Sequence, residues 1–191
     1  PISETFNRFV LERDLQRVER LYRSRGYYQA RARAAHVFRS GSKVRVESVV
    51  EEGPAVLLRR IDLHGLEATP ATLRAEARSA VTEQLELDAP LEEEKLKQAS
   101  EALARILGDH GYAQAKVRQQ ADVNLPQSVA AVGFWVELGQ PSELGEIELT
   151  GLADLPEEQV RRALNLETGA PYSQSDLDEA KRAVLDLGVF G

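Results

Sequence analysis

The chain has 191 residues, of which 42% are hydrophobic and 29% charged, with a net charge of −7. This balance is ordinary for a globular protein, and no run of about 18 apolar residues predicts a membrane-spanning helix. There is no cysteine, which excludes disulfides and thiolate metal sites. The chain begins with Pro1 and has neither an initiator Met nor a charged-then-apolar leader, so we interpret it as a fragment or a processed product.

The charge is unevenly distributed along the chain. Residues 1–60 carry a net charge of +6 and residues 61–191 a net charge of −13. Two interpretations remain open: a solvated basic face, or a basic patch that meets an acidic partner or anionic headgroups. Nucleic acid is not expected as a partner, because the arginines between Arg8 and Arg23 surround a helix and alternate with acidic residues.

The first segment, residues 1–53, predicts one helix and a hairpin. The helix covers about residues 4–24 and ends before Gly26. Two strands, about 28–38 and 43–51, are joined by a Ser-Gly-Ser turn at 40–42. No strand precedes the helix, so this segment is incomplete beside the next one.

Residues 57–139 predict a complete unit. Apolar residues alternate with polar ones from Leu57 to Leu63, which indicates a strand, and Gly65 ends it at a sharp turn. Thr69 as cap and Pro70 at the first helical position predict the start of a helix. A second helix begins at the three carboxylates 92–94, which favour a helix N-terminus.

A hairpin completes this unit. Residues 113–123 and 129–138 alternate in hydrophobicity around the turn-forming loop 124–128. Trp135 lies in the second strand, where we interpret it as a packing residue. The order strand, helix, helix, strand, strand predicts a three-stranded sheet with two amphipathic helices on one face, an α+β layer pair.

The last segment predicts a strand at 146–150 and helices at about 156–165 and 175–187, and then stops. Ser173 with Asp176 three residues later indicates a cap for the second helix. No final hairpin follows. Because a strand without partners leaves backbone groups unpaired, we expect that this segment is not independently stable.

A fixed period relates the three segments. Arg60–Leu66 returns 86 residues later as Glu146–Leu152, with five of seven positions keeping identity or charge sign. Gly53 and Gly139 are also 86 apart, and the Gly-Tyr pairs at 26–27 and 111–112 are 85 apart. A constant period of this size is the signature of an array built from one repeated unit.

These features together resemble POTRA domains, the polypeptide-transport-associated modules of bacterial outer-membrane assembly factors. The resemblance covers nearly the whole chain and includes the element order and several short motifs: Gly26-Tyr27-Tyr28, the Ile-x-Leu-x-Gly-Leu opening at 61–66, the Val-Glu-x-Gly ending at 136–139 and Pro171-Tyr172-Ser173. It implies tandem β-α-α-β-β units, each a three-stranded mixed sheet covered on one face by two helices. We place a first repeat at 1–54, lacking its first strand, a complete middle repeat at 55–140, and a third repeat at 141–191, lacking its final hairpin.

Three tandem units resemble assembly factors of the BamA and TamA type. The resemblance implies a periplasmic array on the inner face of the outer membrane, joined to a β-barrel that this chain does not contain. The implied partners are unfolded outer-membrane protein precursors and periplasmic accessory or lipoprotein partners. Precursors would add a strand to an exposed sheet edge, a mode in which backbone hydrogen bonds give affinity with little sequence demand.

In the resembling modules the outward edge is usually the second strand, which here means residues 29–36 and 113–121. The charged side chains of these strands suit an edge kept from self-association. These charged side chains are equally well explained as ordinary residues on the solvent-exposed face of a sheet. The candidate polypeptide-binding residues are Ala113, Ala115, Val117, Gln119 and Ala121, with Arg31 and Arg33.

Two other functions remain open from the sequence. The array is a pure spacer or docking scaffold for partner proteins, or it is a small α+β ligand-binding domain or enzyme. The sequence has no nucleophile-elbow, Walker or dinucleotide motif, and its three histidines lack metal-ligand spacing. Glu92–Glu94 could chelate a cation, but their place at a helix start explains them. We therefore expect no enzyme, no cofactor and no metal.

Overall fold

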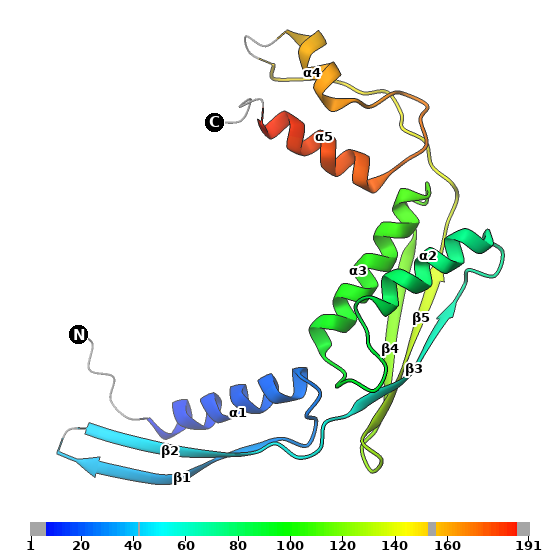
Figure 1. Ribbon diagram of the computed structural model, residues 1–191. Coiled ribbons are helices and arrows are strands. Elements are labelled where there is room, and N and C mark those ends of the chain that lie inside the picture. The colour runs from blue at the N-terminus through cyan, green and yellow to red at the C-terminus, as the bar shows by residue number, and fades with distance from the viewer. Residues whose placement is uncertain (1–6, 42, 153–155, 187–191) are drawn as a thin grey trace. The chain divides into compact units, whose positions relative to one another are not determined.

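The computed structural model describes residues 7–41, 43–152 and 156–186 (Figure 1). In chain order the elements are α1, β1, β2, β3, α2, α3, β4, β5, α4 and α5. Strands β1 and β2 form a two-stranded sheet, and the other three form a sheet in the order β3-β5-β4. This confirms the α+β class and the predicted strand, helix, helix, strand, strand order of the middle repeat.

Contacts divide the chain into two compact units. The first consists of residues 1–62, 85–97 and 120–132, and the second of residues 63–84, 98–119 and 133–191. This division follows the density of contacts and not the sequence period. The repeat boundaries at 54/55 and 140/141 therefore stay a prediction.

In the first unit a helix packs on a hairpin. Helix α1 (Arg8–Ser24) begins at Asn7, whose side chain accepts the Phe9 N–H at 2.9 Å. It packs on β1 (Arg31–Ser40), which pairs antiparallel with β2 (Lys43–Glu51) and bulges between Ala34 and His36. The predicted hairpin is confirmed, while residues 4–6 of the predicted helix lie outside the described residues.

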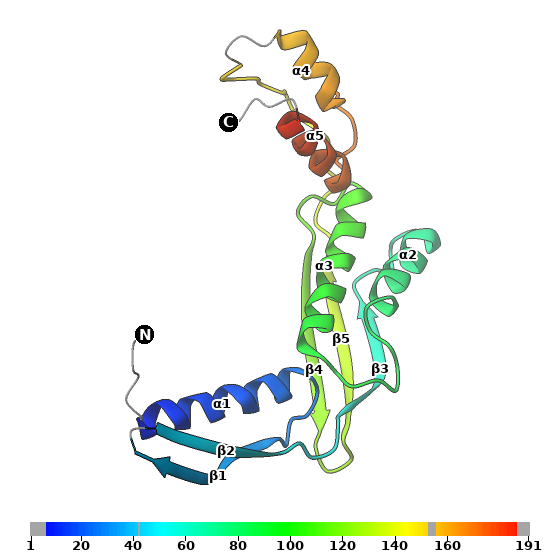
Figure 2. The ribbon, with the colours of Figure 1, turned by 60° about the vertical axis from the view of Figure 1, so that its left-hand side comes forward.

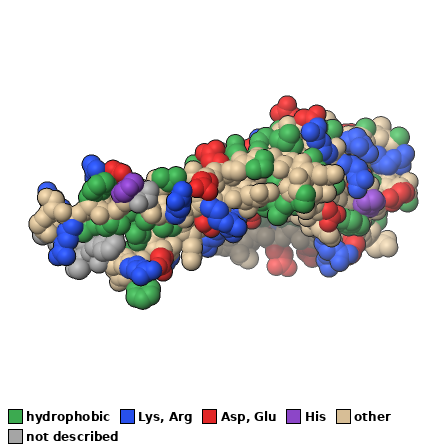
Figure 3. Space-filling view, turned by 90° about the horizontal axis from the view of Figure 1, so that it is seen from below, with side chains coloured by type: hydrophobic (Ala, Val, Ile, Leu, Met, Phe, Trp, Pro, Cys, Tyr) green, Lys and Arg blue, Asp and Glu red, His purple; other side chains and the backbone are tan. Residues whose placement is uncertain are grey.

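This hairpin exposes large apolar side chains. Val37 is 52% exposed, and Phe38, Val44 and Val49 also face solvent. Hydrophobic side chains lie between Lys and Arg side chains over this region in the space-filling view (Figure 3). A two-stranded sheet with one helix has too little surface to bury them, in agreement with a repeat that lacks its first strand.

The middle sheet has β5 (Val129–Glu137) at its centre. The Leu57 N–H at the start of β3 (Leu57–His64) donates to the Ser128 carbonyl at 2.9 Å. At the other end Gly65, with φ +89°, lies against the carbonyl of Val136. The two strands therefore start together and end together, and they run parallel. β4 (Lys116–Asn124) forms the hairpin with β5 and occupies one edge of the sheet.

The core lies between β5 and helices α2 (Ala71–Thr82) and α3 (Glu93–Asp109). Every second residue of β5 is buried on the helix side, and the two helices lie over the same face of the sheet (Figure 2). This confirms the predicted layer pair. The buried residues of these elements include Leu73, Ala77, Val81, Ala99, Leu103, Leu107, Ala130, Val132, Phe134 and Val136.

One predicted helix start is wrong. The hydroxyl of Thr69 does not cap α2 but donates to the Leu66 carbonyl at 2.7 Å. Pro70 is the N-cap, and the helix begins at Ala71 without a side-chain cap. Thr69 is buried, so its hydroxyl takes the acceptor that its own turn supplies. The predicted start of α3 is confirmed, with Glu93 and Glu94 in its first turn.

The predicted strand at 146–150 does not form. Residues 144–150 have no regular secondary structure, and only Glu143 makes an isolated bridge, with Pro171. In the middle repeat β3 is held by β5, whereas residues 144–150 pair with no strand in the part of the chain that the structure describes. Helices α4 (Glu157–Leu164) and α5 (Gln174–Asp186) do form and pack on each other.

The two junctions between repeats are bonded alike. At the first, the Val56 N–H donates to the Gly26 carbonyl at 2.9 Å, and at the second the Ser142 N–H donates to the Gly111 carbonyl at 2.8 Å. The residues after each junction then pair, at equivalent places, with the loop before the second of the two helices that follow, α3 or α5. The matching bonds are Leu91 N–H to Val56 O with Tyr172 N–H to Ser142 O, and Leu58 N–H to Ala89 O with Leu144 N–H to Ala170 O. The period of the sequence is therefore also found in the backbone hydrogen bonds of the two junctions.

Candidate polypeptide-binding edge

Strand β4, the second strand of the middle repeat, lies at the edge of its sheet, as the resemblance to POTRA domains implies. Val117, Gln119 and Ala121 belong to the strand, and Ala113 and Ala115 lie just before it. An edge strand presents a row of N–H and C=O groups that its own sheet does not pair. The geometry needed for strand addition is therefore present here.

The side chains of β4 alternate. Val117 and Ala121 are half-buried on one face, whereas Lys116, Arg118 and Gln120 are exposed on the other; Gln119, on the face of Val117, is also exposed. Arg118 forms an ion pair with Glu137 on the neighbouring β5. Charged side chains along an edge discourage pairing of two identical edges, and they leave the backbone accessible to an extended segment.

The second predicted edge, on β1, is different. Arg31 and Arg33 are exposed there, and Arg33 pairs with Glu51 of β2 at 2.8 Å. The outward N–H of Ala32 donates to the Glu19 carboxylate of α1 at 3.0 Å. One donor of this edge is therefore already bonded. The two groups of predicted site residues lie in different sheets and do not form one site.

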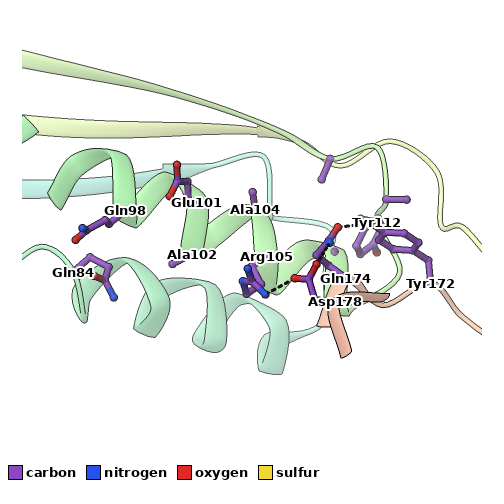
Figure 4. Close-up of a pocket in the computed structure, with 13 residues that line it drawn as sticks. Gln84, Gln98, Glu101, Ala102, Ala104, Arg105, Tyr112, Tyr172, Gln174 and Asp178 are labelled. Atoms are coloured by element: carbon purple, nitrogen blue, oxygen red, sulfur yellow. Dashed lines mark hydrogen bonds and ion pairs between the residues drawn. The ribbon is translucent and has the colours of Figure 1, made fainter. Parts of the chain in front are cut away.

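A cleft of about 670 Å³ adjoins the start of β4 (Figure 4). Its 13 lining residues all belong to the second compact unit. Ala113 and Ala115 form one part of its wall, α3 another, and the first turns of α5 a third. The sequence analysis did not find this cleft. One available signal was the pair of small residues on α3, the exposed Ala104 and, four positions later, the buried Gly108.

An ion pair joins two walls of this cleft. Arg105 of α3 and Asp178 of α5 form an ion pair at 3.0 Å, and the Gln174 amide donates to the same carboxylate at 3.1 Å. The hydrogen bond from Arg105, followed by that from Gln174, lowers the pKa of Asp178. The residue is therefore a carboxylate at neutral pH.

Asp109 joins the end of α3 to the start of α5. Its carboxylate accepts the Ser175 N–H at 2.7 Å and the Ser175 hydroxyl at 2.8 Å. Ser173 in turn accepts the Asp176 N–H at 3.2 Å, which confirms the predicted cap. Two polar side chains from different repeats therefore satisfy the free donors of one helix N-terminus.

Each of the three histidines contacts an aromatic ring or a carboxylate of a neighbouring residue. His64 stacks on Trp135 with ring centroids 5.3 Å apart, His110 lies 3.2 Å from Glu76, and His36 lies 3.7 Å from Glu47. Trp135 is 39% exposed and lies over Gly133, on the sheet face away from the helices.

Within residues 7–41, 43–152 and 156–186, no three His, Cys, Asp or Glu side chains are grouped to hold a metal. No helix of that part is long and apolar enough to cross a membrane.

Several solved structures resemble this chain, two of them as follows. The third to fifth POTRA domains of BamA from Haemophilus influenzae are 22% identical, with a TM-score of 0.65, over 94% of this chain and 70% of that one. BamA from Haemophilus ducreyi lacking POTRA domains 1–3 is 22% identical, with a TM-score of 0.59, over 69% of this chain and 24% of that one. No curated protein sequence matches. At this identity the likeness establishes the fold.

Fold and period together define a tandem-repeat α+β protein. The family model for POTRA, described as surface antigen variable number repeat, matches residues 56–136 and 142–191. The chain therefore belongs to the POTRA family.

Proposed function

We propose that this chain is a periplasmic protein-binding array at the inner face of the outer membrane. It receives unfolded precursors of outer-membrane β-barrel proteins, accessory proteins, or both, and it catalyses no reaction. Membership of the POTRA family and the likeness to POTRA domains of BamA support this role. The observation that carries it is the open edge of β4 beside a cleft.

Strand addition suits such clients for a physical reason. Precursors of β-barrels differ in sequence but share extended segments in which apolar and polar residues alternate. An edge strand binds such a segment through backbone hydrogen bonds, which every sequence offers. Lys116 and Arg118 oppose the pairing of two β4 edges with each other, so the edge stays open to a client.

Proline scanning of β4 tests the proposal. Along an edge strand, the N–H groups alternate between the neighbouring strand and the outside. Of Val117→Pro and Arg118→Pro, the variant that removes an outward N–H keeps the sheet and loses one donor to the client. We expect that folded variant to bind an alternating apolar and polar peptide about tenfold more weakly, since a hydrogen bond contributes about 1 kcal/mol and the ring also obstructs the edge. Unchanged affinity in both folded variants would contradict strand addition at β4.

The second candidate is a docking scaffold that spaces partner proteins without touching clients. The matching backbone hydrogen bonds of both junctions favour it, because a spacer needs junctions of defined geometry. Photo-cross-linkers placed along residues 113–121 separate the two functions. Precursor polypeptides captured there support client binding, whereas capture of assembly partners alone supports the scaffold.

A further inference from the structure

The cleft beside β4 is built by two repeats. Its walls come from α3 and residues 112–115 of the middle repeat, and from Tyr172, Gln174 and Asp178 of the third repeat (Figure 4). A volume of about 670 Å³ is within the range of pockets that hold large side chains or small molecules. The third repeat is therefore part of the surface next to the edge strand.

Contacts between α3 and the start of α5 fix the shape of this cleft. Asp109 bonds both the N–H and the hydroxyl of Ser175, and Arg105 pairs with Asp178. Gly108 allows α5 to start close to α3, because a Cβ there would lie 3.1 Å from the Cβ of Gln174. These contacts hold the first turn of α5 in place, so the cleft exists before anything binds to it.

The chemistry at one end of the cleft is aromatic. Tyr112 and Tyr172 both line it there (Figure 4), and the Tyr172 hydroxyl donates to the Gln174 amide oxygen at 2.6 Å. The exposed Ala104 has no side chain long enough to fill the space beside it. Such an end suits a planar apolar side chain, since aromatic rings gain from edge and offset contacts with one another.

The cleft is continuous with the edge strand. Ala113 and Ala115 line it, and β4 starts at the next residue, Lys116. A client strand that pairs with β4 and extends beyond Ala115 therefore enters the cleft. Because side chains of a strand alternate between its faces, one residue of that extension points into the cleft.

We propose that a client segment added to β4 places an aromatic side chain against Tyr112 and Tyr172. The third repeat then selects among the segments that the middle repeat binds. This inference rests on the proposed function, since it needs a strand at β4. It assigns Tyr172 a role in specificity and names the client class more narrowly, as extended polypeptides with an aromatic residue near one end of the bound segment.

Three peptides test it with the intact 191-residue chain. Each has about ten residues of alternating Val and Thr, with Phe at the amino end, Phe at the carboxyl end, or Ala at both ends. We expect one Phe peptide to bind about tenfold more tightly than the Ala peptide, as burial of an aromatic side chain allows. Tyr172→Ala should remove this preference and leave binding of the Ala peptide unchanged.

A second variant covers the case in which Tyr172→Ala does not fold. Ala104 is exposed on α3, and Ala104→Phe fills the cleft from its wall, so it should also remove the preference. Ala71→Phe, at an exposed position of α2 outside the cleft, is the matched control and should change nothing.

The outcomes separate this inference from the proposed function. Equal affinity of the three peptides, with binding still weakened by the β4 proline, overturns the inference alone. So does a Phe preference that survives both Tyr172→Ala and Ala104→Phe. If the proline variants bind all three peptides as the wild type does, the proposed function fails and this inference fails with it.

Discussion

Asp109 and Ser175, 66 residues apart in sequence, form the tightest polar contact between the middle and third repeats. The carboxylate accepts the N–H at 2.7 Å and the hydroxyl at 2.8 Å. An aspartate at the last position of one helix thus accepts a free backbone donor in the first turn of a helix of the next repeat, beside the cap that Ser173 supplies. The position equivalent to Asp109 at the first junction is Ser24, whose hydroxyl bonds the Leu21 carbonyl of its own helix. The two joints share backbone bonds but differ in this side-chain bridge.

Asp109→Ala should loosen α5 without unfolding the middle repeat. Loss of a capping carboxylate costs about 1 kcal/mol of helix stability, so amides of residues 174–186 should exchange about fivefold faster. Hydrogen exchange with peptide-level resolution measures this. Ser24→Ala is the matched control and should leave α5 unchanged. Exchange in α5 that is identical in the Asp109 variant and the wild type would refute the bridge.

Acid should weaken the same joint. The pKa of Asp178 is held below its ordinary value of 3.8 by hydrogen bonds from Arg105 and then Gln174. A carboxylate with a lowered pKa in the folded state contributes stability above its unfolded pKa, and that contribution is lost as pH falls through the folded value. Protection of α5 amides should therefore fall below about pH 4. Asp178→Asn should flatten this dependence, and an unaltered pH profile in that variant would count against the ion pair.

Gly65 and Gly151 occupy equivalent positions, 86 residues apart, and both have positive φ. Alanine at either position strains the backbone by about 1–2 kcal/mol. At Gly65 the new Cβ would also overlap the Val136 carbonyl, whereas at Gly151 nothing lies within 4 Å. Gly65→Ala should therefore lower the melting temperature clearly more than Gly151→Ala. Equal shifts in thermal denaturation would mean that the sheet adjusts around the methyl group.

The third repeat should open more readily than the middle one in the monomer. Among the residues that the structure describes after 141, Val160 and Ala180 are the fully buried apolar ones, whereas the middle repeat buries a continuous core. Local opening is easier where few apolar contacts are buried. Amides of residues 142–186 should exchange faster than those of 57–137. Equally slow exchange in both regions of a monomer would contradict this, and slow exchange only in a dimer would indicate strands supplied by a neighbour.

Local patterns predicted most elements well. Period-two hydrophobicity found β2 and β5 within one residue, and the carboxylates at 92–94 marked the start of α3. Two predictions failed. Thr69 bonds the Leu66 carbonyl within its own turn instead of capping α2. Residues 146–150 find no strand to pair with, and local sequence does not encode such a partner.

The sequence alone determined the repeat, the element order and the family resemblance, because periodicity and turn residues are properties of neighbouring positions. The predicted edge strand followed from that resemblance. Only the tertiary structure brought Asp109 to Ser175, joined Arg105 to Asp178 and formed the cleft beside Ala113 and Ala115. Those contacts join residues far apart in the chain, and nothing in a one-dimensional period says which side chains meet where two repeats are joined.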